Sequence, residues 1–274
     1  MLKRELVKQF MPSRLTNLMR RQPIAQQNQY IWEGVYSRFQ DVPITGAGHA
    51  SQAYIDATLA HTREIRDRFQ SGAGSKPLAI PAEFTLFPML AAISGFPGQR
   101  LAILDVGGGL GISYIYLRAS APSLDRVQYS VVEVEEISQA GNELFAGDQQ
   151  ITFLPDLPGE AGIGQFDLIQ FCSSLQYIED YRAVLIRACS YRPRFLYLLK
   201  IPVGDFPTFA TAQYNLPGSV VPVWFINHQE LVALCAEQGY SLVYQATHDR
   251  EYDTTNFAPA YRLSLYSHLL FARN

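Results

Sequence analysis

The chain has 274 residues, of which 48% are hydrophobic and 17% are charged, and its formal net charge is −3. This composition excludes a disordered chain and a strongly basic nucleic-acid coat protein, and the length fits one domain with an appendage. No run of about 18 apolar residues is present, so the sequence predicts no membrane-spanning helix.

Charge and cysteine usage indicate partners and compartment. Residues 1–21 hold six basic residues and one acidic residue, whereas the remaining chain holds 16 basic and 24 acidic residues. The acidic remainder disfavours a nucleic-acid partner, while the basic segment keeps peripheral membrane contact open as an alternative to a solvated tail. The three cysteines form no Cys-x-x-Cys pair, and the N-terminus lacks the apolar core of a signal peptide, so we expect a cytoplasmic protein.

Residues 1–99 are expected to form a helical lid or substrate region before the main domain. Ser51 is a suitable N-cap, and apolar residues recur after it at steps of three and four, which predicts a helix that ends before Gly72. A second helix is predicted from about Glu83 to Ser94. Aromatic residues of this region, such as Tyr54, would close one side of a substrate site at the domain junction.

After Arg100, short apolar strands alternate with helical stretches, which is typical of a parallel sheet covered on both faces. The expected strands are 101–106, 128–133, 151–154, 166–171, 195–201, 241–247 and 261–271. The expected helices are 111–119, 135–145, 180–190 and 227–238. About a dozen residues without a helical pattern separate the last two strands, so these should form an antiparallel hairpin.

The segment 202–225 lies between a predicted strand and the helix that begins near Asn227. It contains four prolines and five aromatic residues. Prolines reduce the entropy lost when a loop becomes ordered, and aromatic faces stack on planar rings or sugars. We interpret the segment as an aromatic loop beside the acceptor site, and a proline-rich cover on the core is the alternative.

The stretch Leu104-Asp105-Val106-Gly107-Gly108-Gly109-Leu110-Gly111 lies where the first of these strands meets its helix. Its glycines let the backbone turn sharply and approach a ligand, and the helix N-terminus offers free N–H groups. The dinucleotide fingerprint requires a glycine where Ile112 stands, and the Gly-Lys-Ser/Thr ending of a P-loop is missing. An acidic residue before the glycines would repel a pyrophosphate and suits a cationic ligand such as S-adenosylmethionine.

Residues 105–111 resemble the first motif of class I S-adenosylmethionine-dependent methyltransferases. The resemblance covers residues 100–274 and implies an α/β fold: a doubly wound, Rossmann-like sheet of seven mostly parallel strands with an antiparallel C-terminal hairpin. The cofactor it implies is S-adenosyl-L-methionine. Four short segments also resemble a poorly characterised group of methyltransferase-like proteins that is associated with bacterial cell-surface polysaccharide gene clusters. These segments are 32–36, 132–134, 140–141 and 225–227.

The resemblance further implies a set of cofactor-binding residues. They are Asp105, Gly107, Gly109, Gly111, Glu133, Val134, Asp156, Leu157, Cys172 and Ser173. Glu133 would accept hydrogen bonds from both ribose hydroxyls, since a carboxylate has two acceptor oxygens, and Val134 would pack on the adenine. Asp156, with the Leu157 backbone, would meet the adenine amino group.

Each of these residue types also has a structural interpretation. The segment 171–177 resembles the fourth motif of the family, where cofactor and substrate contacts meet. Cys172 is compatible with a buried packing residue, Ser173 with a turn, and Glu133 with an acid at a helix start. The glycines are compatible with a plain strand-to-helix turn.

Methyl transfer is an in-line displacement, so the protein mainly has to align a nucleophile, and a general base helps a hydroxyl acceptor. Histidine titrates near neutral pH. His228 is the first candidate because it follows the segment 202–225, and His49 is the second; a structural role is the alternative for each. Carboxylates and histidines do not cluster at ligand spacing, so we expect no metal site.

The sequence therefore predicts an S-adenosylmethionine-dependent methyltransferase that O-methylates a small-molecule or saccharide acceptor, in polysaccharide biosynthesis. One alternative is a regulatory protein that binds the cofactor without transferring a methyl group. Another is a nicotinamide-dependent oxidoreductase, which Ile112 disfavours. The oligomeric state stays open.

Overall fold

The computed structural model describes residues 30–71, 81, 84, 86–95, 99–121, 124, 126–162, 164–263 and 265–274. The basic segment 1–21 and the expected helix start at Glu83 lie outside the described residues. None of the helices in the described ranges combines the length and the hydropathy that a bilayer span requires.

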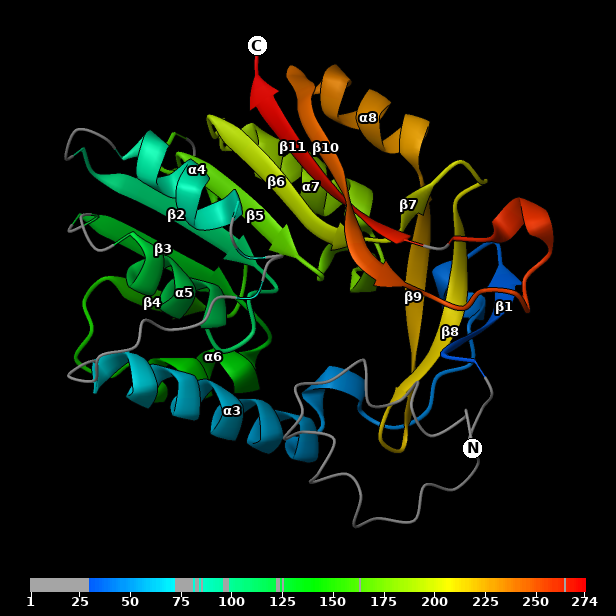
Figure 1. Cartoon of the computed structure of the whole chain (residues 1–274), viewed down its shortest axis with the longest axis horizontal. Helices are drawn as coiled ribbons and strands as arrows, with labels where there is room; N and C mark the ends of the chain where they lie inside the picture. The colour runs from blue at the N-terminus through cyan, green and yellow to red at the C-terminus, as the bar shows by residue number, and fades with distance from the viewer. Residues whose placement is uncertain are drawn as a thin grey trace.

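A large sheet of seven strands forms the centre of the molecule (Figure 1). Its strands are β2 (Leu101–Val106), β3 (Val127–Val132), β4 (Ile151–Leu154), β5 (Leu168–Cys172), β6 (Phe195–Ile201), β10 (Tyr240–Glu251) and β11 (Leu265–Arg273). They lie in the order β10-β11-β6-β5-β2-β3-β4. Strands β2 to β6 pair in parallel, whereas β11 is antiparallel to both β6 and β10. The predicted seven-stranded sheet with an antiparallel C-terminal hairpin is confirmed.

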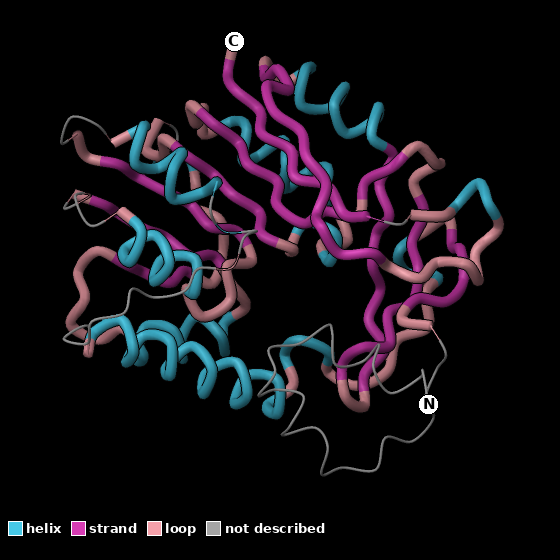
Figure 2. The backbone as a smooth tube through the Cα atoms, viewed as in Figure 1, coloured by secondary structure: helices cyan, strands magenta, loops and turns pink. Residues whose placement is uncertain are grey.

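Helices cover both faces of this sheet, as Figures 1 and 2 show. The helices are α3 (Gln52–Gln70), α4 (Leu86–Ser94), α5 (Ile112–Ser120), α6 (Glu135–Leu144), α7 (Tyr181–Ser190) and α8 (His228–Glu237). The first four share one hydrophobic core with one face of the sheet, and α7 and α8 share the core of the other face. All six residues of β2 are buried because both of its faces are covered, which explains why five of them are apolar and Asp105 is the one exception.

The helix after Ser51 is confirmed, and the Ser51 hydroxyl accepts a hydrogen bond from the Tyr54 N–H at 3.4 Å, as an N-cap does. Ile55 and Ile65 of α3 are buried in the core that also contains residues of α5 and α6. The described N-terminal region therefore packs directly on the helices of the large sheet.

A second sheet of four strands departs from the sequence prediction. Its strands are β1 (Trp32–Tyr36), β7 (Val203–Gly204), β8 (Phe209–Leu216) and β9 (Ser219–Asn227), in the order β1-β8-β9-β7. The interpretation of residues 202–225 as an aromatic loop was wrong, because most of them form the antiparallel hairpin β8–β9. Pro217 lies in its turn, and Pro222 lies in β9 away from the two residues that pair with β7.

The small sheet stands at the carboxyl ends of the parallel strands. In Figure 1 the arrowheads of β2, β5 and β6 point toward it. An aromatic core that includes Trp32, Phe209, Phe225 and Tyr266 joins the small sheet to the end of β11. Open α/β sheets bind ligands at the carboxyl ends of their strands, so the small sheet closes the side where a ligand is expected.

Candidate functional site

The glycine loop 107–111 connects β2 to α5 at the point where the strand order reverses between β3 and β5. Gly107 has a φ of 70°, and a Cβ there would lie 2.3 Å from the Cβ of Ser174, so only glycine allows this approach to the loop after β5. Gly109 has a φ of 58°, and a Cβ there would meet no atom within 4 Å. Gly111 precedes α5, and a Cβ there would lie 2.9 Å from Ile151. The loop is packed at both ends and open in the middle.

Asp105 lies directly beneath this loop and has no exposed surface. Its Oδ2 accepts a hydrogen bond of 2.7 Å from the Tyr129 hydroxyl, which in turn accepts one of 3.0 Å from the Gln170 amide. Its Oδ1 is buried and has no hydrogen-bond partner among the described residues. Burial raises the pKa of Asp105 to about 6, against the opposing effect of the Tyr129 hydrogen bond. An unpartnered carboxylate oxygen at this position favours a cationic ligand above the loop.

Glu133 follows β3 and joins it to the glycine loop. Its Oε1 accepts a hydrogen bond of 3.0 Å from the Gly109 N–H, and its Oε2 accepts one of 3.1 Å from the Val134 N–H. Burial raises the pKa of Glu133, and these two backbone hydrogen bonds oppose the rise. Each carboxylate oxygen keeps a second lone pair, so the group can still accept bonds from two hydroxyls. Val134 is 47% exposed beside it and offers an apolar surface.

The ends of β4 and β5 bring the remaining predicted cofactor residues to the same edge. Asp156 is exposed after β4, and its Oδ1 accepts a hydrogen bond of 2.7 Å from the Leu157 N–H, so this N–H is occupied. Cys172 is the last residue of β5 and is partly buried. Ser173 has a φ of 55° and accepts a hydrogen bond of 3.2 Å from the Gln176 amide.

His49 lies at this edge although it is far from the glycine loop in the sequence. Its ring meets the edges of two tyrosine rings, Tyr177 at 4.6 Å and Tyr54 at 5.0 Å between centroids. Tyr177 follows β5, and the charge of Glu133 contributes to a raised pKa of Tyr54, behind the larger effect of burial. Burial lowers the pKa of His49 to about 4, so the imidazole is neutral at physiological pH.

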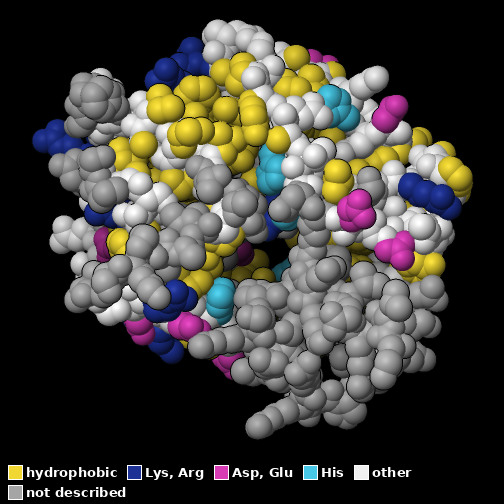
Figure 3. Space-filling model, viewed as in Figure 1, with side chains coloured by type: hydrophobic (Ala, Val, Ile, Leu, Met, Phe, Trp, Pro, Cys, Tyr) yellow, Lys and Arg dark blue, Asp and Glu magenta, His cyan; other side chains and the backbone are white. Residues whose placement is uncertain are grey.

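Gln213 of β8 connects the small sheet to the end of β5, and the sequence interpretation missed it. Its Oε1 accepts a hydrogen bond of 3.1 Å from the Trp32 indole, and its Nε2 donates one of 3.1 Å to the Tyr177 hydroxyl. Burial raises the pKa of Tyr177 to about 12. The space-filling view shows a hollow near the middle of the face, with histidine side chains around it (Figure 3). A signal for Gln213 appears only once the strand register of β8 is known, because its neighbours in the sequence carry no motif.

His228 lies elsewhere. It is the first residue of α8, and its Nε2 is 3.0 Å from the Gln245 amide oxygen of β10. Strand β10 is the outermost strand of the large sheet and is separated from β2 by β11, β6 and β5. The structure therefore brings His49, and not His228, to the edge that carries the glycine loop. Among the described residues, no group of three or more His, Cys, Asp or Glu side chains could hold a metal ion.

No family model and no curated protein matches the chain. Solved structures do match. A candidate S-adenosylmethionine-dependent methyltransferase of Listeria monocytogenes aligns with a TM-score of 0.51 at 11% identity, over 70% of this chain and 99% of its own. The 1,6-didemethyltoxoflavin-N1-methyltransferase of Burkholderia thailandensis, with bound S-adenosylhomocysteine, aligns at 0.48 and 16% identity, over 84% and 92%.

The magnesium protoporphyrin IX methyltransferase of Synechocystis, also with bound S-adenosylhomocysteine, aligns with a TM-score of 0.43 at 17% identity, over 84% of this chain and 90% of its own. At these identities the similarity is one of fold. The strand order described above and the Listeria structure together show that the large sheet has the Rossmann-like methyltransferase fold.

Proposed function

We propose that this protein is an S-adenosylmethionine-dependent methyltransferase that acts on a small molecule. The observation that carries the proposal is the open position of Gly109, which donates a hydrogen bond to the Glu133 carboxylate and directly follows Gly108 above the buried Asp105 carboxylate. Such an arrangement lets a ligand lie against the loop backbone, with negative charge beneath it and acceptor oxygens beside it.

The residues present fit S-adenosylmethionine. The loop 107–111 and the charge of Asp105 would hold the cationic amino-acid end, Glu133 would hold the ribose hydroxyls, and Val134 would cover one face of the adenine. When bound, the cofactor supplies a methyl group that its positive sulfonium activates. The protein then has to exclude water and to align an acceptor with that group. The small sheet, which stands at this edge, suits both tasks.

We further propose that His49 is the general base and that the acceptor is a hydroxyl group. Burial keeps the His49 imidazole neutral at physiological pH, which is the state in which a ring nitrogen can accept the hydroxyl proton, and it also lowers the basicity of that nitrogen, with a pKa of about 4. The ring contacts with Tyr54 and Tyr177 hold its orientation. Both His49 and Tyr54 belong to residues 1–99, which supports a substrate-binding role for that region. His228, at the far edge of the sheet, is the second candidate.

We also propose a saccharide acceptor, a role in polysaccharide biosynthesis and a cytoplasmic location. The aromatic rings beside His49 support a ring-shaped acceptor, since aromatic faces stack on sugars. None of the three cysteines forms a disulfide in the described part of the chain, which suits a reducing compartment. For the segment 1–21 we retain contact with a membrane surface as a proposal that its charge supports.

The test is calorimetric titration of S-adenosylmethionine, S-adenosylhomocysteine and NAD into the wild type, Glu133→Ala and Glu135→Ala. Glu135 is the matched control because it is the first residue of α6 and its carboxylate bonds only locally, to Gln139. We expect saturable binding of both S-adenosyl compounds by the wild type and by Glu135→Ala, at least tenfold weaker binding by Glu133→Ala, and no binding of NAD. Binding of NAD alone, or no binding, would overturn the proposal.

A methyl-transfer screen with nucleotide sugars and small hydroxyl compounds follows, using His49→Gln and His228→Gln. Loss of turnover in the first variant with retained cofactor binding supports His49 as the base. Cofactor binding by the wild type without transfer to any acceptor would instead favour the regulatory alternative.

A further inference from the structure

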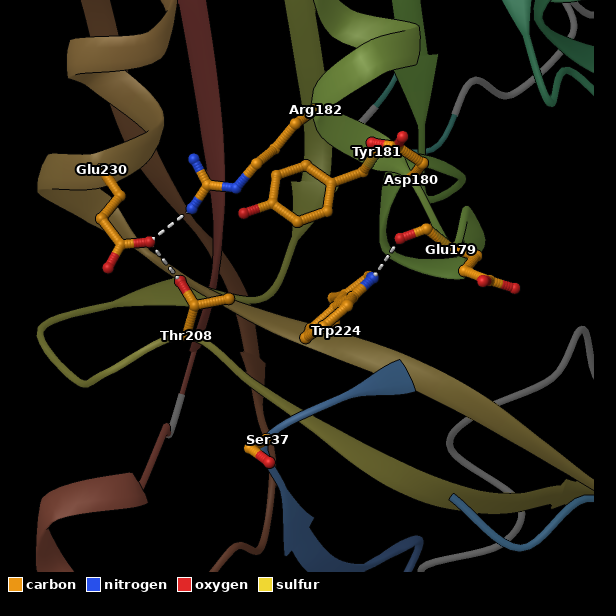
Figure 4. A pocket seen from close by; sticks show the side chains of 8 residues that line it. All are labelled: Ser37, Glu179, Asp180, Tyr181, Arg182, Thr208, Trp224 and Glu230. Carbon is orange, nitrogen blue, oxygen red and sulfur yellow. Dashed lines mark hydrogen bonds and ion pairs between the residues drawn. The ribbon is translucent and has the colours of Figure 1, made fainter. Parts of the chain in front are cut away.

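A pocket of about 360 Å³ lies on the opposite face of the small sheet from Gln213. It is lined by Trp224 of β9, the residues just before β8 and just after β1, and the start of α7 and α8 with the two residues that precede α7 (Figure 4). Side chains alternate between the faces of a strand, so Trp224 points into this pocket while Phe225 packs in the aromatic core with Trp32. The pocket therefore lies on the face of the small sheet opposite to the aromatic core that contains Trp32 and Phe225.

One cation, Arg182, and three carboxylates, those of Glu179, Asp180 and Glu230, line the pocket. Arg182 and Glu230 form an ion pair of 2.7 Å, and the Thr208 hydroxyl donates a second hydrogen bond of 2.9 Å to the same Glu230 oxygen. In Figure 4 the carboxylate of Glu179 points away from the space between these residues. The Asp180 carboxylate accepts a hydrogen bond from the Ala183 N–H at the start of α7, and the Glu179 carboxylate accepts one from Gln40. The charged groups left for a ligand are then Arg182 and Glu230, each about half exposed, which favours a molecule with several polar groups and no net charge.

A buried hydroxyl in the pocket lacks a well-formed hydrogen bond. Tyr181 is 3% exposed, and its hydroxyl makes no hydrogen bond of good geometry with a described residue, although the Arg182 and Thr208 side chains lie near it. In Figure 4 this hydroxyl points toward the space between Glu230, Thr208 and Trp224. A buried polar group without a well-formed hydrogen bond destabilises a protein, so its presence indicates that a ligand completes the hydrogen bonding here.

Trp224 supplies an apolar surface beside these polar groups. Its indole N–H donates a hydrogen bond of 3.0 Å to the Glu179 carbonyl oxygen, so the ring itself is what remains for a ligand. Phe39 stacks on it with 5.4 Å between ring centroids, which fixes its orientation. An aromatic surface next to hydroxyl, carboxylate and guanidinium groups matches a ring that has apolar C–H faces and polar hydroxyls at its rim.

We infer that this pocket binds one uncharged, polyhydroxylated ring of the size of a monosaccharide. Its volume is near the lower end of the roughly 300–1,000 Å³ that small-molecule sites span, which suits a single ring. The inference goes beyond the proposed function and does not depend on it, because none of the pocket residues is among those proposed to hold the cofactor or to act as the base. The site would hold a saccharide unit away from the place of methyl transfer.

The test uses the indole N–H signals in proton–nitrogen correlation spectra. The chain has two tryptophans, so Trp32 in the other face's core serves as an internal reference for Trp224. The probes are glucose, galactose, mannose and N-acetylglucosamine at millimolar concentration, with glycerol and ethanolamine as controls. We expect at least one sugar to shift the Trp224 signal saturably while the Trp32 signal stays in place. No saturable shift, or an equal shift with glycerol, would overturn the inference.

Two variants test the contacts. Glu230→Gln should weaken the binding of that sugar about tenfold, whereas Glu237→Gln, an exposed carboxylate on the same helix, should not. Tyr181→Phe should weaken binding with little change in the melting temperature, because the hydroxyl that it removes makes no hydrogen bond of good geometry with a described residue. A Tyr181→Phe protein that binds the sugar as the wild type does would refute the role of this hydroxyl. S-adenosylhomocysteine binding should be unchanged in all three variants. Failure of sugar binding at this pocket can therefore be told apart from failure of cofactor binding at the glycine loop.

Discussion

Asp105→Asn should stabilise the protein at neutral pH when no cofactor is bound. Burial raises the pKa of Asp105 from 3.8 to about 6. Each pKa unit corresponds to about 1.4 kcal/mol, so ionising this carboxylate in the folded protein costs roughly 3 kcal/mol more than in the unfolded chain. Because the pKa of Asp105 is higher in the folded protein, the protonated carboxyl group stabilises the fold relative to the ionised one. This stabilisation is fully present below the unfolded pKa and is lost as the pH rises through about 6. The wild type therefore carries the whole penalty at pH 7.5.

The asparagine keeps an oxygen for the Tyr129 hydroxyl and removes the charge. The free energy of unfolding of Asp105→Asn, relative to the wild type, should increase by about 2 kcal/mol between pH 4.5 and pH 7.5. The cost of burying the neutral amide is the same at both pH values, so it cancels when the relative free energy of unfolding at pH 4.5 is subtracted from that at pH 7.5. Tyr129→Phe should act in the opposite direction, since it removes the hydroxyl that stabilises the ionised Asp105.

Urea unfolding of the cofactor-free protein at the two pH values measures both variants. Added S-adenosylhomocysteine should then raise the melting temperature of the wild type more than that of Asp105→Asn, because its ammonium group offsets the buried charge. If Asp105→Asn is less stable than the wild type by the same amount at both pH values, the carboxylate is not an uncompensated charge and the argument from burial is wrong.

Two further predictions concern the loop and the base. Gly107→Ala should lower the free energy of unfolding by about 2–4 kcal/mol because its Cβ would lie 2.3 Å from the Cβ of Ser174. Gly109→Ala should lower it by only about 1 kcal/mol, because of its positive φ, and should weaken S-adenosylhomocysteine binding at least tenfold. Urea unfolding measures the stabilities and calorimetry the binding, and equal losses of stability in the two variants would contradict the open position of Gly109. Burial lowers the pKa of His49 to about 4, so the imidazole stays neutral in the folded protein down to nearly that pH. The value of kcat should therefore stay flat from pH 8 to pH 5 and fall only as the pH approaches 4, whereas a decline centred near pH 6.5 would indicate a different base.

Much of the large sheet could be predicted because its signals are local. The bounds of β4 and β6 match the predicted ranges 151–154 and 195–201, and Ser51 caps its helix as expected. Each of these signals lies within a few residues of the element it defines. The glycine loop and Glu133 could be predicted for the same reason, since strand ends in a parallel sheet meet at one edge.

The small sheet and the choice between two histidines depend on contacts between distant segments. The sequence of Trp32–Tyr36 is only five residues long and includes a glycine, so it does not by itself predict a strand. These residues form β1 because they pair with β8, which is distant in the sequence. The sequence favours His228 as the base only if the segment before it is a loop beside the acceptor. That segment forms the hairpin β8–β9 instead, so its position no longer favours His228. Gln170 and Gln213 acquire their hydrogen bonds only through register and burial, which single-residue patterns do not encode.

The pairing of β1 with β8 also sets the order in which the chain can assemble. Trp32 pairs with Gln213, which follows it by 181 residues, so β1 leaves the ribosome long before its partner exists. At about 5–20 residues per second, the wait is roughly 10 to 40 s. During that time Trp32, which is 3% exposed in the folded protein, has no aromatic core to enter. We therefore expect chaperones to bind the nascent N-terminal region while Trp32 is exposed. A protein that lacks residues up to Tyr36 would expose the unpaired edge of β8 to other chains.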